Sequence, residues 1–247
     1  MRILLVNVNT TAAVTATMVE QARAVAAPET EIIGLTPSIG ATSVEGNFES
    51  YLAAVAVIDV VQSYKGPYDA VIQAGFGEHG REALQELLAV PVVDITEAAV
   101  LLAHLLGHRY SIVTTLDRTV PLIEDRLKLA GLDAHCVSIR SSGLSVLELE
   151  RDEERTTKAI VAQSVRAVRE DRAEVICLGC GGMAGLSAAV AMGAGVPVVD
   201  GVTAGTKLAE SLVALHLSTS KVRTYALPRT KTVLGWPLHQ SSGPAAP

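Results

Sequence analysis

Short apolar runs alternate along the chain with longer segments in which apolar residues recur at helical spacing. Runs rich in Val, Ile and Leu are typical of buried strands. The runs that predict strands cover residues 2–7, 70–74, 91–95, 110–114, 174–178 and 197–200. The segments that predict helices cover residues 10–26, 49–64, 97–106, 119–130, 151–170 and 204–215. This alternation indicates parallel β-sheet covered by helices.

The second half of the chain repeats the pattern of the first. The sequence PVVD at residues 91–94 recurs at residues 197–200, behind matching strand, glycine-rich turn and helix segments. An alignment of the two halves places Gly75 opposite Cys180. The duplication predicts an α/β fold of two pseudo-symmetric lobes, each a mostly parallel sheet flanked by helices. We expect lobes over residues 1–105 and 106–235, and a loose tail, rich in Pro and Gly, over residues 236–247.

Composition narrows the range of partners. Hydrophobic residues make up 49% of the chain and aromatic residues 3%, as suits a layered α/β core. Acidic residues outnumber basic ones, 26 to 20, without a long basic run, which argues against a nucleic-acid partner. The apolar start is too short for a signal peptide, and no later run reaches membrane-spanning length. We therefore expect a cytoplasmic protein that acts on a small molecule and binds neither nucleic acid nor membrane.

The three cysteines are too few and too scattered for a disulfide framework, so reduced thiols are expected. Cys180 follows a predicted strand and precedes Gly181, Gly182 and a predicted helix. Backbone amides and a helix dipole at such a position lower a thiol pKa below about 8.5, which suits a nucleophile or proton carrier. The alternative is a small buried apolar side chain, which we favour for Cys136 and Cys177. No second pair or nearby His completes the CxxC of Cys177 and Cys180 as a metal site.

Other candidate groups follow the predicted strands, where parallel-sheet enzymes bind their ligands. Glu78 and His79 lie in the turn that the repeat pairs with the Cys180 turn, and either is a candidate second acid or base. The alternative is that both only favour the first turn of a helix. Asn9, Thr114 and Thr115 offer donors suited to an amide or carboxylate, although helix capping alone accounts for such residues.

Residues 179–184 also fit the dinucleotide fingerprint GxGxxA, and Asp200 follows near the distance expected for a ribose contact. Such a fingerprint normally follows the first strand of its unit, whereas this one lies late in the chain. Its glycine-rich turn and the Asp also have counterparts in the first half, so duplication explains both features with one cause. A nucleotide-binding module is therefore the less favoured alternative.

The chain resembles the hydantoin and allantoin racemases, within the wider aspartate/glutamate racemase superfamily. The likeness covers nearly the whole chain. It rests on residues 3–11, where members usually read NPNT and this chain reads NVNT, on Glu45-Gly46, Phe76-Gly77 with Gly80, and on residues 91–92, 97–99, 111–114, 178–183 and 196–200.

The resemblance implies two α/β lobes with the active site between them, no metal, no pyridoxal phosphate, and a homo-oligomer. Two cysteines on opposite faces of the substrate act as acid and base in turn. One of them corresponds to Cys180, and the other should stand where this chain has Gly75. Three explanations stay open: an engineered inactivation, a second base supplied by Glu78, His79 or water, or a one-thiol reaction. Arylmalonate decarboxylases of the superfamily use one thiol, with a glycine in the first lobe.

Racemisation and decarboxylation both pass through an enolate-like intermediate that needs hydrogen-bond donors. The amides of Phe76, Gly77, Gly181 and Gly182 are predicted to supply them, and Glu45 is placed with the substrate-binding residues by the resemblance. The implied activity is a cofactor-independent racemase that moves the C5 proton of a 5-substituted hydantoin or related cyclic ureide. The alternatives within enzymes are a decarboxylase and an isomerase that protonates one face only.

Overall fold

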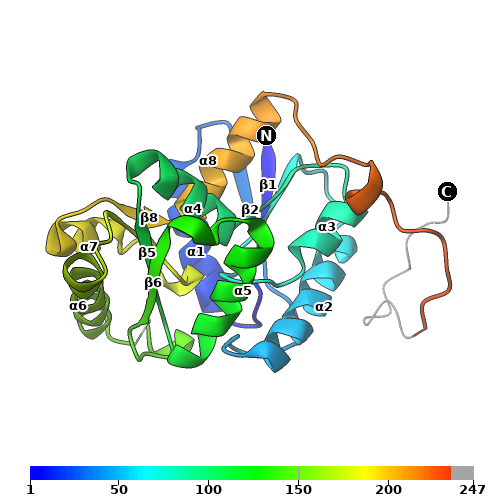
Figure 1. Ribbon diagram of the computed structural model, residues 1–247. Helices are drawn as coiled ribbons and strands as arrows, with labels where there is room; N and C mark the ends of the chain where they lie inside the picture. The colour runs from blue at the N-terminus through cyan, green and yellow to red at the C-terminus, as the bar shows by residue number, and fades with distance from the viewer. Residues whose placement is uncertain (150, 235–247) are drawn as a thin grey trace.

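The computed structural model describes residues 1–149 and 151–234 (Figure 1). Strands in these ranges are β1 (Arg2–Val6), β2 (Glu31–Leu35), β3 (Ala70–Gln73), β4 (Val92–Asp94), β5 (Tyr110–Thr114), β6 (Cys136–Ser141), β7 (Val175–Leu178) and β8 (Val198–Asp200). Helices are α1 (Ala12–Val25), α2 (Asn47–Ser63), α3 (Arg81–Leu87), α4 (Ile95–Leu106), α5 (Val120–Ala130), α6 (Glu153–Glu170), α7 (Ser187–Ala194) and α8 (Gly201–Ala214). Short 3-10 turns are η1 (Asp117–Thr119), η2 (Asp133–His135), η3 (Val146–Glu148), η4 (Gly181–Met183) and η5 (Arg223–Tyr225).

The strands form two parallel sheets of equivalent order within the described residues, β2-β1-β3-β4 and β6-β5-β7-β8. The central strands β3, β5 and β7 are buried at every position, which explains their nearly continuous apolar sequence. Their registers match as well, since Gln73 pairs with Asp94 in the first sheet and Leu178 with Asp200 in the second. The predicted fold class, two lobes that each hold a parallel sheet flanked by helices, is confirmed.

Two of the edge strands, β2 and β6, were not predicted from the sequence. Neither is uniformly buried: β6 is half-buried at all of its positions, and Glu31 and Gly34 of β2 are exposed. An edge strand that covers the core with only part of its surface needs fewer apolar residues. The apolar signal is therefore weaker in these two segments than in the central strands.

After each PVVD segment, the next helix packs against the sheet of the other half of the chain. Each Asp ends a strand and caps the following helix: Asp94 accepts hydrogen bonds from two amides of α4, and Asp200 from two amides of α8. Helix α4 then packs against β7 and β8 of the second sheet, while α8 packs against β3 and β4 of the first. Figure 1 shows α8, in orange, beside α4.

The crossing of α4 and α8 joins the two halves in one core. A Cβ atom on Gly201, the first residue of α8, would lie 2.5 Å from the carbonyl oxygen of Ile95, so this approach requires glycine. Cys177 lies in the same core, fully buried, as expected for a packing residue. The lobe boundary near residue 105 stays a prediction, and the tail predicted over 236–247 lies outside the described residues. No helix within residues 1–149 and 151–234 has the length and apolarity to span a membrane.

Candidate active site between the two sheets

The carboxyl ends of β1, β3, β5 and β7 surround a cavity of about 50 Å³. First-half residues that line it are Asn7, Val8, Asn9, Val14, Met18, Val44, Ala74, Gly75, Phe76 and His79. Second-half residues that line it are Thr114, Thr115, Thr119, Val146, Gly179, Cys180, Gly181 and Gly182. The turns after β3 and β7 meet here, since a Cβ atom on Gly181 would lie 3.2 Å from the carbonyl oxygen of Ala74.

Most of the residues predicted for the site therefore lie around one cavity. Those brought together are Asn9, Gly75, Phe76, His79, Thr114, Thr115, Cys180, Gly181 and Gly182. Glu45, Gly77 and Glu78 lie outside its lining. Glu45 is next to the lining residue Val44, and its carboxylate accepts a 3.4 Å hydrogen bond from the amide of Val146. The amide of Gly77 donates to the hydroxyl of Thr96 at 2.9 Å, so it is already engaged within the protein.

Cys180 directly follows β7 and begins the 3-10 turn η4. Burial raises the pKa of its thiol to about 11, although the amide of Gly182 acts in the opposite direction. The lowered thiol pKa expected from the sequence is therefore wrong. The next α-helix, α7, begins only at Ser187, so Cys180 does not sit at the start of a long helix dipole. In the resting site the thiol is protonated at neutral pH.

His79 faces the same cavity from the turn after β3 and is 4% exposed. Its Nδ1 lies 3.0 Å from the hydroxyl oxygen of Ser50, and that hydroxyl also lies 2.7 Å from the carbonyl oxygen of Glu78. Burial lowers the pKa of His79 to about 4. The imidazole is therefore neutral at physiological pH, in the form that accepts a proton.

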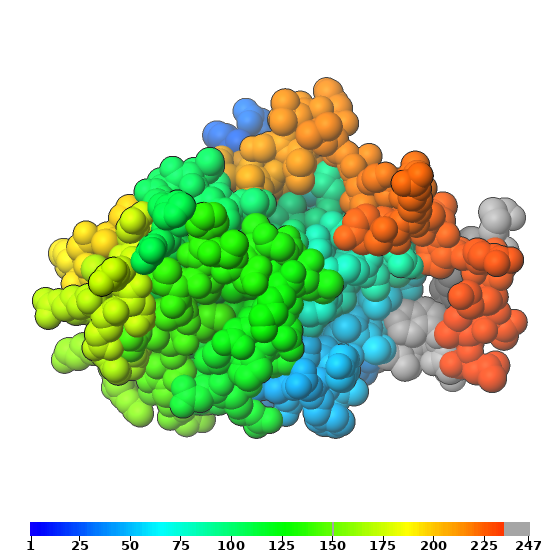
Figure 2. Space-filling model, viewed as in Figure 1, coloured from blue at the N-terminus to red at the C-terminus, as the bar shows by residue number. Residues whose placement is uncertain are grey.

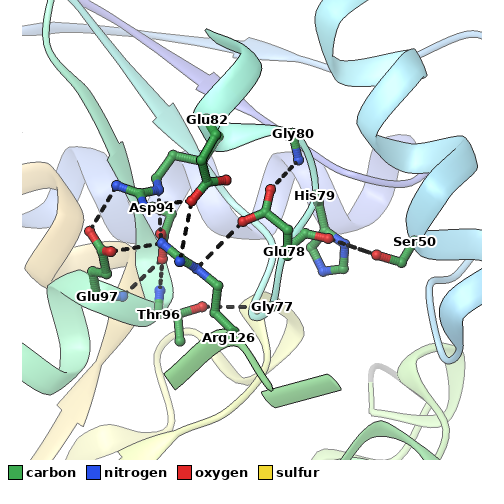
Figure 3. A network of polar contacts seen from close by, with 11 residues as sticks. Ser50, Gly77, Glu78, His79, Gly80, Glu82, Asp94, Thr96, Glu97 and Arg126 are labelled. Atoms are coloured by element: carbon green, nitrogen blue, oxygen red, sulfur yellow. Dashed lines mark hydrogen bonds and ion pairs between the residues drawn. The ribbon is translucent and has the colours of Figure 1, made fainter. Parts of the chain in front are cut away.

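Glu78 points away from His79, toward Arg126 and Gly80 (Figure 3). Its carboxylate accepts a hydrogen bond from the amide of Gly80 at 3.0 Å, and burial together with Glu82 raises its pKa to about 7. Glu78 lines a second cavity of about 420 Å³ between α2, α3 and α5. Figure 2 shows the green surface of α5 beside the blue surface of α2.

Arg126 of α5 crosses from the second lobe into a cluster of first-lobe carboxylates (Figure 3). Its guanidinium lies 2.6 Å from Asp94 and 2.8 Å from Glu97, with Glu82 at 3.4 Å. The side chain is fully buried. Its Nε also lies 3.7 Å from the carboxylate of Glu78, so Arg126 ties the second half of the chain to the turn that carries His79. Sequence reasoning missed this cluster, because its members are spread over several elements and each one reads as an ordinary helix or cap residue.

The polar residues at the strand ends mostly bind one another. Asn7 donates from Nδ2 to Asn9 Oδ1 at 3.0 Å and to Thr15 Oγ1 at 3.0 Å, which shapes the loop after β1. The hydroxyl of Thr114 donates to the carbonyl oxygen of Gly179 at 3.0 Å and so supports the residue before Cys180. Thr114 is thus a structural support of the thiol turn.

Asp200 is committed to the fold. Its carboxylate caps α8 and also accepts a hydrogen bond from the amide of Gly185 at 3.0 Å. It is 4% exposed, so it does not present a carboxylate to a ribose. The GxGxxA match is therefore explained by the turn and cap that both halves share. Val8, Met18 and Val146 also line the cavity, but the sequence offers no sign that separates them from core residues.

Known proteins resemble this chain over most of its length. Residues 3–209 match the family model described as Asp/Glu/Hydantoin racemase. A hydantoin racemase of Pseudomonas sp. (strain NS671) is 38% identical over 236 residues, which are 95% of this chain and 95% of that protein. The crystal structure of allantoin racemase from Pseudomonas fluorescens superposes with a TM-score of 0.94 at 70% identity, over 95% of this chain and 100% of the other. Arylmalonate decarboxylase, at 22% identity and a TM-score of 0.57 over 86% of this chain and 92% of its own, shares the fold.

Proposed function

Because the chain belongs to the Asp/Glu/hydantoin racemase family, we propose that it is a cofactor-independent racemase acting at C5 of a 5-substituted hydantoin or related cyclic ureide. The resemblance stated from the motifs is confirmed by these relatives. Allantoin, a hydantoin with a ureido group at C5, falls within the proposed substrate class. The observation that carries the proposal is that Cys180 and His79 line one cavity from the equivalent turns of the two lobes.

His79 is the better candidate for the second acid or base. Its imidazole lines the cavity, whereas the carboxylate of Glu78 is held by Gly80 and Arg126 outside the lining. Gly75 supplies no side chain at the place where the family resemblance expects a thiol. We therefore assign the first-lobe proton transfer to His79 and the second-lobe transfer to Cys180.

The resting protonation states fit this division of roles. Burial lowers the pKa of His79 to about 4 and raises that of Cys180 to about 11, so a neutral imidazole faces a protonated thiol. The imidazole removes the C5 proton, and the C–H electron pair moves into the enolate of the adjacent carbonyl. The thiol then donates its proton to the opposite face of C5. This leaves imidazolium and thiolate, the pair that acts on the opposite enantiomer, because there the thiolate removes the C5 proton and the imidazolium donates one to the other face. Proton exchange with water interconverts the two pairs, which hold the same number of protons.

The amides near Cys180 supply the electrostatic support that the charged species need. The Gly182 amide lowers the pKa of the thiol and thus stabilises the thiolate left after proton donation. Gly181 and Phe76 line the cavity, and their backbone amides are the proposed donors to the developing enolate oxygen. The Gly77 amide, already bound by Thr96, is left out of this set.

The test follows deuterium at C5 and optical rotation together, from each enantiomer of allantoin and of 5-substituted hydantoins in D2O. We expect both enantiomers to lose rotation as C5 gains deuterium. Cys180→Ala should slow this by roughly 10²–10⁴-fold, the usual contribution of a general acid or base. Cys136→Ala is the matched control, since this thiol lies outside the cavity lining and should leave the rate unchanged.

Two other outcomes would point to different functions. Deuteration with retained rotation, from one enantiomer only, would identify an isomerase that protonates one face. Absence of exchange, together with release of carbon dioxide from an arylmalonate, would identify a decarboxylase, the second candidate that Gly75 favours. A cytoplasmic location and a homo-oligomer remain predictions, which cell fractionation and light scattering would test.

A further inference from the structure

Three neighbouring side chains occupy the space where a side chain at position 75 would begin. A Cβ atom built on Gly75 would lie 2.5 Å from Cδ2 of His79, 2.5 Å from Cγ1 of Val8 and 2.8 Å from Nε2 of Gln73. All three distances are shorter than van der Waals contact allows. Gly75 is not among the glycines with positive φ, so the backbone conformation alone does not demand glycine here. The demand comes from the three side chains that converge on this point.

The His79 imidazole is held in this position from both sides. Behind it, Nδ1 lies 3.0 Å from the hydroxyl of Ser50. In front of it, a Cβ atom on Gly77 would lie 3.0 Å from Nε2, and Gly77 also has a φ of +137°. The ring is buried and therefore cannot turn outward without breaking its contacts. Gly75, Gly77 and Ser50 thus surround the imidazole ring of His79 and fix its position.

We propose that Gly75 is a positioning residue that seats the His79 imidazole in the space of a first-lobe thiol, so that a side chain at position 75 and an imidazole at position 79 exclude each other. The catalytic role of His79 in this inference rests on the proposed function. The steric exclusion between positions 75 and 79 rests on the distances at Gly75 alone. On this view the glycine at position 75 makes room for His79, which takes the place of the first-lobe thiol in the acid–base pair. Val8, which stands where related sequences usually have proline, closes the same space.

One consequence is that Gly75→Cys by itself does not create a two-thiol racemase. The new Cβ atom would collide with His79 and Val8 before its sulfur reached the cavity. Removing the imidazole takes away one of the two closest contacts and leaves Val8 Cγ1 and Gln73 Nε2, both at the ends of side chains, to shift aside. The variant Gly75→Cys/His79→Ala should therefore tolerate the second thiol, whereas Gly75→Cys should not.

The steric part is tested by a double-mutant cycle on thermal unfolding. Gly75→Ala should lower Tm by roughly 2–12 °C, the range expected for overpacking in a chain of this size. In the His79→Ala background the same substitution should cost less than half as much. Gly205→Ala is the control, because its Cβ atom would meet nothing closer than 3.4 Å, and its Tm should not fall.

Unchanged Tm in Gly75→Ala, or an equal loss in both backgrounds, would overturn the proposal. If Gly75→Ala does not fold, a folded Gly75→Ala/His79→Ala protein supports the proposal, and failure of both variants assigns the obstruction to Val8 and Gln73 and refutes it. These readouts do not depend on racemase activity, so they separate this inference from the proposed function.

The catalytic part is tested by the pH dependence of racemisation. Gly75→Cys should be slower than the wild type, and Gly75→Cys/His79→Ala faster than Gly75→Cys alone. The double variant should also lose the acidic limb of the rate profile that His79 gives the wild type. A Gly75→Cys variant that racemises faster than the wild type at an unchanged Tm would refute the exclusion. An unaltered acidic limb in the double variant would refute the assignment of that proton transfer to His79.

Discussion

Replacing Arg126 with Met removes the buried cation between the two lobes while keeping most of the side chain's length. The guanidinium is fully buried and lies within 2.8 Å of Asp94 and Glu97. Without it, Arg81 is left to neutralise these carboxylates, which it contacts at 3.3 Å and 3.1 Å. Loss of one partner of a buried ion pair typically costs about 3–5 kcal/mol. For a domain of this size that corresponds to a fall in Tm of roughly 6–20 °C.

The pH dependence separates lost charge from lost packing. Arg126 lowers the pKa of Glu78, which burial raises from 4.5 to about 7, so its removal should raise that pKa further. A carboxyl group whose pKa is higher in the folded chain stabilises the fold below its unfolded pKa, and this contribution is lost as the pH rises through the folded pKa. The deficit of Arg126→Met should therefore be greatest above about pH 7 and shrink as the pH falls toward 4.5.

The assay compares urea and thermal unfolding of Arg126→Met with that of Lys128→Met across this pH range. Lys128 lies on the same helix, but its side chain is 61% exposed and its nearest carboxylate is 4.0 Å away, so the control should change stability by at most about 0.5 kcal/mol. Equal losses in the two variants would refute the assigned role of the buried cluster. A large loss in Arg126→Met that does not vary with pH would show that packing, and not charge, is responsible.

The helix crossing, the buried imidazole and the thiol each give a further expected outcome. In calorimetry, Gly201→Ala should lower Tm, because its Cβ atom would lie 2.5 Å from the Ile95 carbonyl oxygen, whereas Gly205→Ala should raise stability by about 0.5–1 kcal/mol. Burial lowers the pKa of His79 from 6.5 to about 4, so its contribution to stability is present above pH 6.5 and is lost as the pH falls through 4. The urea midpoint of His79→Gln should therefore change less with pH across this window than that of the wild type. Alkylation of Cys180 by iodoacetamide should still accelerate above pH 9, because its pKa is about 11, and a plateau below pH 9 would contradict the burial argument.

The central strands of the fold could be predicted from the sequence, because their apolar runs and the helix caps that follow them are strong local patterns. Buried strands such as β3 and β7 are continuous apolar runs, and the aspartates that end β4 and β8 have fixed jobs as helix caps. The repeat then placed Gly75 opposite Cys180, and the structure has the two residues on one cavity. The edge strands β2 and β6 were not predicted, because partial exposure dilutes their apolar pattern, whereas β4 and β8, also at sheet edges, carry the apolar PVVD repeat.

The electrostatics of the site could not be predicted in the same way. The pKa of Cys180 depends on burial by residues from both halves, and the short turn that follows it contains too few aligned amides to offset that burial. The role of Arg126 depends on a helix of one lobe reaching carboxylates of the other. The thiol pKa and the Arg126 ion pairs both depend on residues that are far apart in the sequence, whereas a motif contains only residues that are adjacent in the sequence.

The turns after β3 and β7, which are equivalent in the two repeats, are held by different side chains. In the second half, Asp200 binds the amide of Gly185 and holds its turn directly. In the first half, the equivalent Asp94 is drawn into an ion pair with Arg126, and the amide of Gly80 bonds instead to Glu78. The first turn is therefore anchored by its own Glu78 and by Ser50 rather than by the aspartate. A duplicated scaffold thus carries a thiol in one turn and a buried imidazole in the other, and different side chains hold the two turns in place.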